Sequence, residues 1–181
     1  VISDDVKDAI REYLVSFVQN RIPTVTAGMN VHASHDLVFR QICDAISKIA
    51  KIDLPLSFPS LVPTLMEGIL RVTTVNADHD TQTHGLVRFQ CATCLEAILM
   101  ELKSKRLLID RKYIKSVAVE YCAPLCEILV TALQSQVTIL CRGEYEENTS
   151  DDNTKHTFGC TIAIAKIVRH LLVEGFTSVM T

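Results

Sequence analysis

The chain has 181 residues, of which 48% are hydrophobic and 22% are charged, with only 6 glycines and 5 prolines. This composition predicts a folded, helix-rich chain and excludes a disordered or collagen-like one. The formal net charge of −3 gives no basic surface for nucleic acid. No uncharged apolar run reaches the roughly 18 residues that span a bilayer. Neither nucleic acid nor a membrane is therefore predicted as a partner.

Six stretches carry apolar residues at helical spacing, and none alternates polar and apolar residues as a strand does. The first begins with Asp4 and Asp5, which suit the positive end of a helix dipole, and its predicted apolar stripe consists of Val6, Ile10, Tyr13, Leu14 and Phe17. The predicted apolar faces of the third and fourth include Leu65, Leu95 and Ile98. Pro124 falls inside the fifth stretch and predicts a kink or break there. The chain is predicted to be all-α, with helices over about 3–20, 34–52, 58–72, 81–104, 110–141 and 154–173.

The predicted helices are arranged as pairs. A short proline-bearing turn joins the second to the third, and a basic turn, SKRLLID, joins the fourth to the fifth. Each pair occupies about 40 to 60 residues, which is close to the length of a HEAT-type repeat. The first and last helices lack partners, and the chain starts in mid-pattern. We therefore expect one segment of α-solenoid over 1–181, about three helical pairs, excised from a longer chain.

The turn between the second and third helices holds three of the prolines, in the stretch DLPLSFPSLVPTL over residues 53–65. Pro55 ends one helix, and Pro59 falls in the first turn of the next, where a missing N–H costs nothing. Ser57 is a candidate cap for that helix. Pro63 either loses one hydrogen bond or lies in the first turn too, if the helix begins near Ser60. Taken on the residues alone, the stretch is a rigid helix–helix corner with Phe58 packed beneath it.

The seven cysteines all lie in or at the ends of apolar helical patterns. Cys91 and Cys94, followed by Cys122 and Cys126, superficially resemble a four-cysteine zinc site. Zinc ribbons place such pairs on tight turns, whereas Cys91 and Cys94 share the apolar stripe of a helix. The cysteines are therefore predicted to be buried thiols in a reducing compartment, and no metal is expected.

No catalytic pattern surrounds the remaining polar clusters. His32 with His35, and the Asp78–Asp80 stretch with His84, fall in connections or at helix starts, without a nucleophile elbow or phosphate loop. The acidic stretch 144–152 and the basic residues of 103–112 are either solvated or open to a charged partner. We predict no enzyme activity, no catalytic residue and no cofactor.

The proline corner resembles a segment of a known family. In the importin-β (karyopherin) family, an early repeat carries the pattern Asp-x-Pro-x-x-Trp-Pro-x-Leu-x-Pro-x-Leu, which residues 53–65 match with Phe58 in place of Trp. Residues 42–53, ICDAISKIAKID, resemble the helix that leads into that corner. Residues 101–112, ELKSKRLLIDRK, resemble a segment of the importin-eleven group. The resemblance covers nearly the whole chain in order.

This resemblance implies a HEAT-repeat fragment from the N-terminal part of a nuclear transport receptor. Such receptors bind the GTP-bound Ran GTPase on a concave face, carry protein cargo, contact phenylalanine-glycine nucleoporins, and shuttle between cytoplasm and nucleus. The third and fifth helices are then concave, and the partner-binding residues expected on them are Glu67, Arg71, Lys112 and Glu120. The alternative is a generic HEAT or armadillo scaffold that binds other proteins and has no part in transport.

Overall fold

The computed structural model describes residues 3–20, 31–71, 80–103, 108–141 and 152–176. The described part is all-α and contains no strand, which confirms the predicted fold class. It consists of helices α1 (Asp4–Asn20), α2 (Val31–Asp53), α3 (Leu61–Leu70), α4 (Asp80–Lys103), α5 (Leu108–Cys141) and α6 (Asp152–Phe176).

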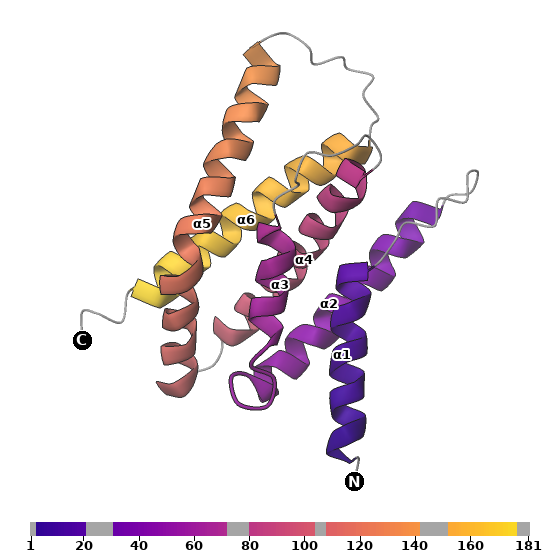
Figure 1. Ribbon diagram of the computed structural model, residues 1–181, viewed down its shortest axis with the longest axis vertical. Helices are drawn as coiled ribbons and strands as arrows, with labels where there is room; N and C mark the ends of the chain where they lie inside the picture. Colours follow the sequence, from indigo (N-terminus) through magenta and orange to yellow (C-terminus); the bar gives the residue numbers. More distant parts are fainter. Residues whose placement is uncertain (1–2, 21–30, 72–79, 104–107, 142–151, 177–181) are drawn as a thin grey trace.

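The helices are arranged in two rows, which Figure 1 shows crossing each other. Helices α2, α4 and α6 form the first row, because α4 packs extensively against both α2 and α6. Helices α1, α3 and α5 form the second row, and contacts within it are sparse. The rows are joined where α3 packs on α4 and α5 packs on α6. We call the row of α2, α4 and α6 the even row, and the row of α1, α3 and α5 the odd row.

Helix α4 is the centre of the molecule. It contacts α1, α2, α3 and α6, so it is covered over more than one face. Its buried apolar residues include Leu95 and Ile98, which are fully buried, and Leu99 and Leu102, which are nearly so. Helix α3 contributes five more buried residues to the same core: Leu61, Val62, Leu65, Met66 and Ile69.

Two glycines allow the helices to approach α4 closely. A Cβ atom added at Gly68 of α3 would lie 2.5 Å from Cys91 Sγ of α4. A Cβ atom added at Gly159 of α6 would lie 2.7 Å from an edge carbon of the Phe89 ring, also on α4. Separations below 3.0 Å require a neighbour to move, so both positions favour glycine.

The proline corner differs in one detail from the sequence prediction. Helix α3 begins at Leu61 with Ser60 as its N-cap residue, so Ser57 is not the cap. The backbone N–H of Ser57 instead donates to the Asp53 carbonyl at 2.7 Å and continues the turn after α2. Pro63 therefore lies in the first turn of α3, where its missing N–H leaves no intrahelical bond unmade.

The helix pairing also differs. We expected α2 to pair with α3 and α4 with α5, but α3 packs on α4 and α5 on α6. Among the described residues, neither expected pair is in extensive contact. The turns showed where the helices end. Which helix meets the apolar face of α3 depends on the direction that the corner gives it, and turn composition does not specify that direction.

Two further expectations need correction. Helix α5 is continuous through Pro124, which excludes a break, one of the two outcomes predicted there. Of the stripe predicted on α1, only Leu14 and Phe17 are partly buried against the core, while the buried residues Val15 and Val18 were not predicted to belong to it. Val6, Ile10 and Tyr13 are exposed, because α1 is the outermost helix of the odd row and its first turns lie beyond its neighbours.

Candidate protein-binding surfaces

Arg11 of α1 is held against the proline corner. Its Nε and Nη2 atoms both donate to Asp53 Oδ2, at 2.8 and 2.7 Å, and the two side chains are only 12% and 16% exposed. The same guanidinium carbon lies 6.0 Å from the centroid of the Phe58 ring, which is the geometry of a cation–π contact. Asp53 and Phe58, two residues of the proline corner, thus hold helix α1 in position through Arg11.

The predicted partner-binding residues of α3 lie on its exposed side. Glu67 and Arg71 form an ion pair at 3.6 Å between Oε1 and Nη2, and their side chains are 69% and 65% exposed. Arg88 of α4 donates to the Arg71 carbonyl at 2.9 Å. Such an exposed pair contributes little to stability, so both groups remain free to bind a partner.

The predicted residues of α5, Lys112 and Glu120, are also exposed. Burial and the neighbouring Glu120 carboxylate raise the pKa of Tyr121 to about 12. Burial likewise raises the pKa of Tyr113 to about 12, and its buried hydroxyl has no hydrogen-bond partner in the described part of the chain. The four residues therefore belong to two helical segments of the odd row, α3 and α5, that touch at few places.

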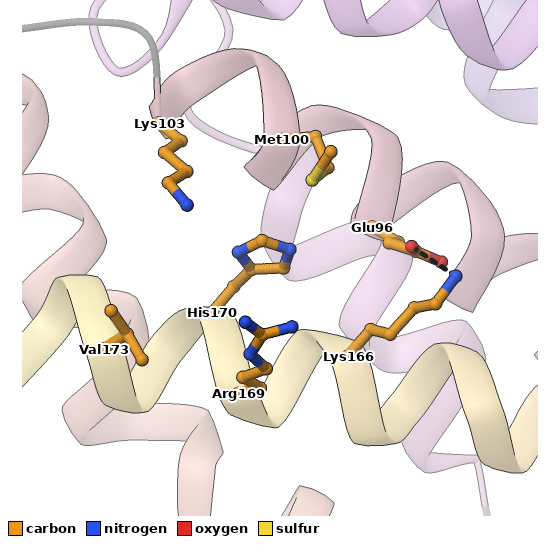
Figure 2. A pocket seen from close by; sticks show the side chains of 7 residues that line it. All are labelled: Glu96, Met100, Lys103, Lys166, Arg169, His170 and Val173. Carbon is orange, nitrogen blue, oxygen red and sulfur yellow. Dashed lines mark ion pairs between the residues drawn. The ribbon is translucent and has the colours of Figure 1, made fainter.

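A pocket of about 360 Å³ lies between α4 and α6, in the even row. Figure 2 shows the residues of α4 and α6 that face each other across it. Lys166 Nζ and Glu96 Oε1 form an ion pair at 2.9 Å, whereas Lys103 Nζ reaches Glu174 Oε1 only at 3.9 Å. The lining residues are Glu96, Met100, Lys103, Lys166, Arg169, His170 and Val173.

The electrostatics of this pocket are positive. Lys103, Lys166 and Arg169 line it with a single carboxylate, Glu96. Partial burial and then the charge of Lys103 lower the pKa of His170. The site was not predicted from the sequence. Its signal there was the stretch KIVRH over 166–170, which places Lys166, Arg169 and His170 at helical spacing within an apolar stretch of α6.

The buried cysteines act as core residues. Cys43, Cys91, Cys94 and Cys160 are buried, as predicted. Burial raises the pKa of Cys91 to about 12 and that of Cys160 to about 11. A hydrogen bond with Cys43 and burial raise the pKa of Cys94 well above its usual value. These thiols are poor nucleophiles, because the thiolate is the reactive form.

The prediction of buried thiols was wrong for Cys141, which is exposed, and Cys122 and Cys126 are half-buried. All three lie on α5, which within the described residues packs mainly against α6. No group of three or more metal-ligating side chains occurs among the described residues.

Several predicted features lie outside the described residues or side chains. These are His32, His35, residues 78–80, His84, the acidic stretch 144–152, and residues 104–110 of the basic turn. By length and composition alone, Arg111–Thr138 of α5 is apolar enough to cross a membrane. One such helix is weak support for a membrane location, and α5 here packs along α6.

No protein-family model, no curated protein and no solved structure matches the chain.

Proposed function

We propose that this chain is part of a nuclear transport receptor of the importin-β family, similar to the importin-eleven group. In this proposal it binds GTP-bound Ran, protein cargo and phenylalanine-glycine nucleoporins, and it moves between cytoplasm and nucleus. It acts by protein–protein binding, without catalysis, cofactor, nucleic acid or membrane. The observation that carries the proposal is the proline corner, where Asp53 and Phe58 anchor Arg11 of the preceding helix.

The arrangement of the helices supports a HEAT-type solenoid as the architecture. Helix α4 packs on α2 and on α6, while α2 and α6 are not in extensive contact within the described residues. Contacts of this kind, confined to neighbours, are typical of solenoids. The exposed apolar residues of α6, Ile162 and Leu172, are then the surface that a following repeat would cover.

The odd row supplies the proposed Ran-binding or cargo-binding surface. Glu67 and Arg71 on α3, with Lys112 and Glu120 on α5, present both signs of charge on exposed side chains. Mixed charges that remain in water steer a protein partner and set its orientation, while most of the affinity comes from apolar contacts nearby. Exposed apolar side chains are also present on α5, where Val119 and Val130 are 67% and 52% exposed.

The test is a titration with Ran loaded with GTP and with GDP, against this chain and against the longer native chain that the proposal implies. We expect binding that is selective for GTP. A variant that reverses all four charges (Glu67→Lys, Arg71→Glu, Lys112→Glu and Glu120→Lys) keeps the net charge and should weaken binding about tenfold or more. The matched control, Arg40→Glu with Asp44→Lys on α2, also keeps the net charge and should bind as the parent does.

A different result decides against the proposal. If both chains are folded and helical but bind neither form of Ran selectively, the transport function is rejected. The generic HEAT or armadillo scaffold is then the better interpretation, and the proline corner serves packing alone. If the charge-reversed variant binds GTP-bound Ran with full affinity, the odd row is not the binding surface.

A further inference from the structure

The pocket between α4 and α6 has charges that its own surroundings do not neutralise. Lys166 is paired with Glu96 at 2.9 Å, but Lys103 lies 3.9 Å from Glu174, at the outer limit of an ion pair. Arg169 has no ion-pair partner among the described residues. In Figure 2, Lys103 from α4 and Arg169 from α6 both lie beside His170. Two cationic groups therefore border a space whose one lining carboxylate, Glu96, is already paired with Lys166.

The lining of the same pocket also includes two apolar residues. Met100 of α4 and Val173 of α6 line it and are 55% and 46% exposed. An isolated exposed apolar residue is ordinary, but here the two border a concavity with cations between them. The pocket therefore offers one contact for an anion and another for an apolar side chain, within a volume of about 360 Å³.

We propose that the α4–α6 pocket binds an acidic peptide segment of a partner protein, in which a carboxylate-bearing residue adjoins an apolar one. The carboxylate lies between Lys103 and Arg169, and the apolar side chain packs on Met100 and Val173. Arg is well suited to such a contact, because its guanidinium donates two parallel hydrogen bonds to one carboxylate. The site lies on the even row, so it is separate from the odd-row surface proposed for Ran.

A peptide fits better than a polyanion such as nucleic acid or an anionic membrane. Glu96 and Glu174 lie at the pocket and beside it, and both repel an extended row of phosphates. The chain as a whole carries a formal net charge of −3, which also opposes a polyanion. A single carboxylate with an apolar neighbour meets the cations without approaching Glu96, which Lys166 already neutralises.

The experiment is a selection from a random peptide display library against this chain, followed by titration of the enriched peptides. We expect enrichment of Asp or Glu next to an apolar residue. Arg169→Glu should weaken binding of the selected peptides about tenfold or more, and Met100→Ser should weaken it by a smaller factor. Arg169 is exposed, so its replacement should leave the fold and the thermal midpoint unchanged.

Matched controls separate this site from general charge attraction. Arg40→Glu on α2 makes the same change of net charge outside the pocket and should leave binding unchanged. Replacing the acidic residue of a selected peptide by its amide should abolish binding. The carboxylate should also raise the pKa of His170, which is seen as a shift of its imidazole signal that is absent from His170→Gln.

The proposal is overturned if the library gives no enrichment, or if the enriched peptides lack a carboxylate. It is also overturned if Arg40→Glu weakens binding as much as Arg169→Glu does. Binding of inorganic phosphate or anionic vesicles that depends on Arg169, without binding of any peptide, would assign the pocket to a different ligand class. Because Ran is not used, the outcome is independent of the transport proposal.

Discussion

Gly68 lies where α3 packs closely against α4. A Cβ atom there would lie 2.5 Å from Cys91 Sγ and 3.4 Å from Cys91 Cβ. The sulfur belongs to a fully buried side chain, so it has little room to withdraw. The absence of a side chain at Gly68 is therefore a packing requirement of this helix crossing, and the cost of adding one is set by how far α3 and α4 must separate.

Gly68→Ala should lower the free energy of unfolding by about 1–3 kcal/mol, because the added methyl group overpacks a closed interface. Urea unfolding followed by circular dichroism measures the change. The informative control is the double variant Gly68→Ala with Cys91→Ala, in which the clashing sulfur is removed. The double variant should lose less stability than the two single variants together. A strictly additive result would show that Cys91 is not what opposes a side chain at Gly68.

His170 makes the stability depend on pH. Partial burial and the charge of Lys103 lower its pKa below the ordinary value of 6.5, and Arg169 acts in the same direction, while Glu96 and Glu174 act against it. Between the folded and unfolded pKa values the unfolded chain therefore binds more protons. Stability should fall as pH drops from about 6.5 toward the folded pKa, and the slope from this residue should vanish below it.

His170→Gln should flatten this part of the profile, because a glutamine does not titrate. The measurement is the thermal midpoint of the parent and the variant across that pH range, at constant ionic strength. Equal slopes in both proteins would mean that His170 has the same pKa folded and unfolded.

At the scale of elements, the burial of the apolar residues of α5 changes along its length. Leu125 is fully buried where α5 packs in the core, whereas Leu133, two turns later, is 46% exposed. The two leucines therefore provide a matched pair on one helix. Leu125→Ala should cost about 2–5 kcal/mol through the cavity it leaves. Leu133→Ala should cost less than about 1 kcal/mol, since little buried area is lost. Similar losses at both positions would show that the second half of α5 is covered in solution.

The sequence predicted the elements better than their faces. Leu65, Leu95 and Ile98 were predicted on the apolar stripes of α3 and α4, and all three are buried. They are buried because other helices cover α3 and α4 on more than one side. The stripe of α1 was predicted equally well by periodicity, yet Ile10 is 45% exposed and Tyr13 is 71% exposed. Periodicity shows which residues share a face. Whether another helix covers that face depends on tertiary arrangement, which no local pattern contains.

At the scale of the whole molecule, protection from exchange should follow the distance from α4. Helix α4 contacts four other helices, while the second half of α5 has exposed apolar residues such as Val130 and Val137. Amide hydrogen exchange should therefore be slowest in α4, at a rate set by global unfolding, and fastest in the second half of α5. Mass spectrometry of peptic fragments measures both in one experiment. Slower exchange in α5 than in α4 would contradict the central position of α4.

As with the helix faces, the sequence predicted site residues that share one helix and missed those that two helices bring together. Glu67 and Arg71 were identified from the sequence because they recur on the polar side of one helix, and the structure places both on the surface. The α4–α6 pocket was missed, because Lys103 and Arg169 are 66 positions apart in the chain. Only the packing of α6 on α4 brings them to one place.

The two rows differ in a way that governs how the molecule deforms. The even row is continuous, with α4 tightly packed between α2 and α6, whereas α3 touches its odd-row neighbours at few places. A body bonded along one side and open along the other resists stretching on the first side and bends about it. The even row is therefore the neutral axis, and curvature changes by spreading or closing the odd row. A partner that inserts between α3 and α5 has few contacts to break. The helix ends that lie farthest from the even row then move the most.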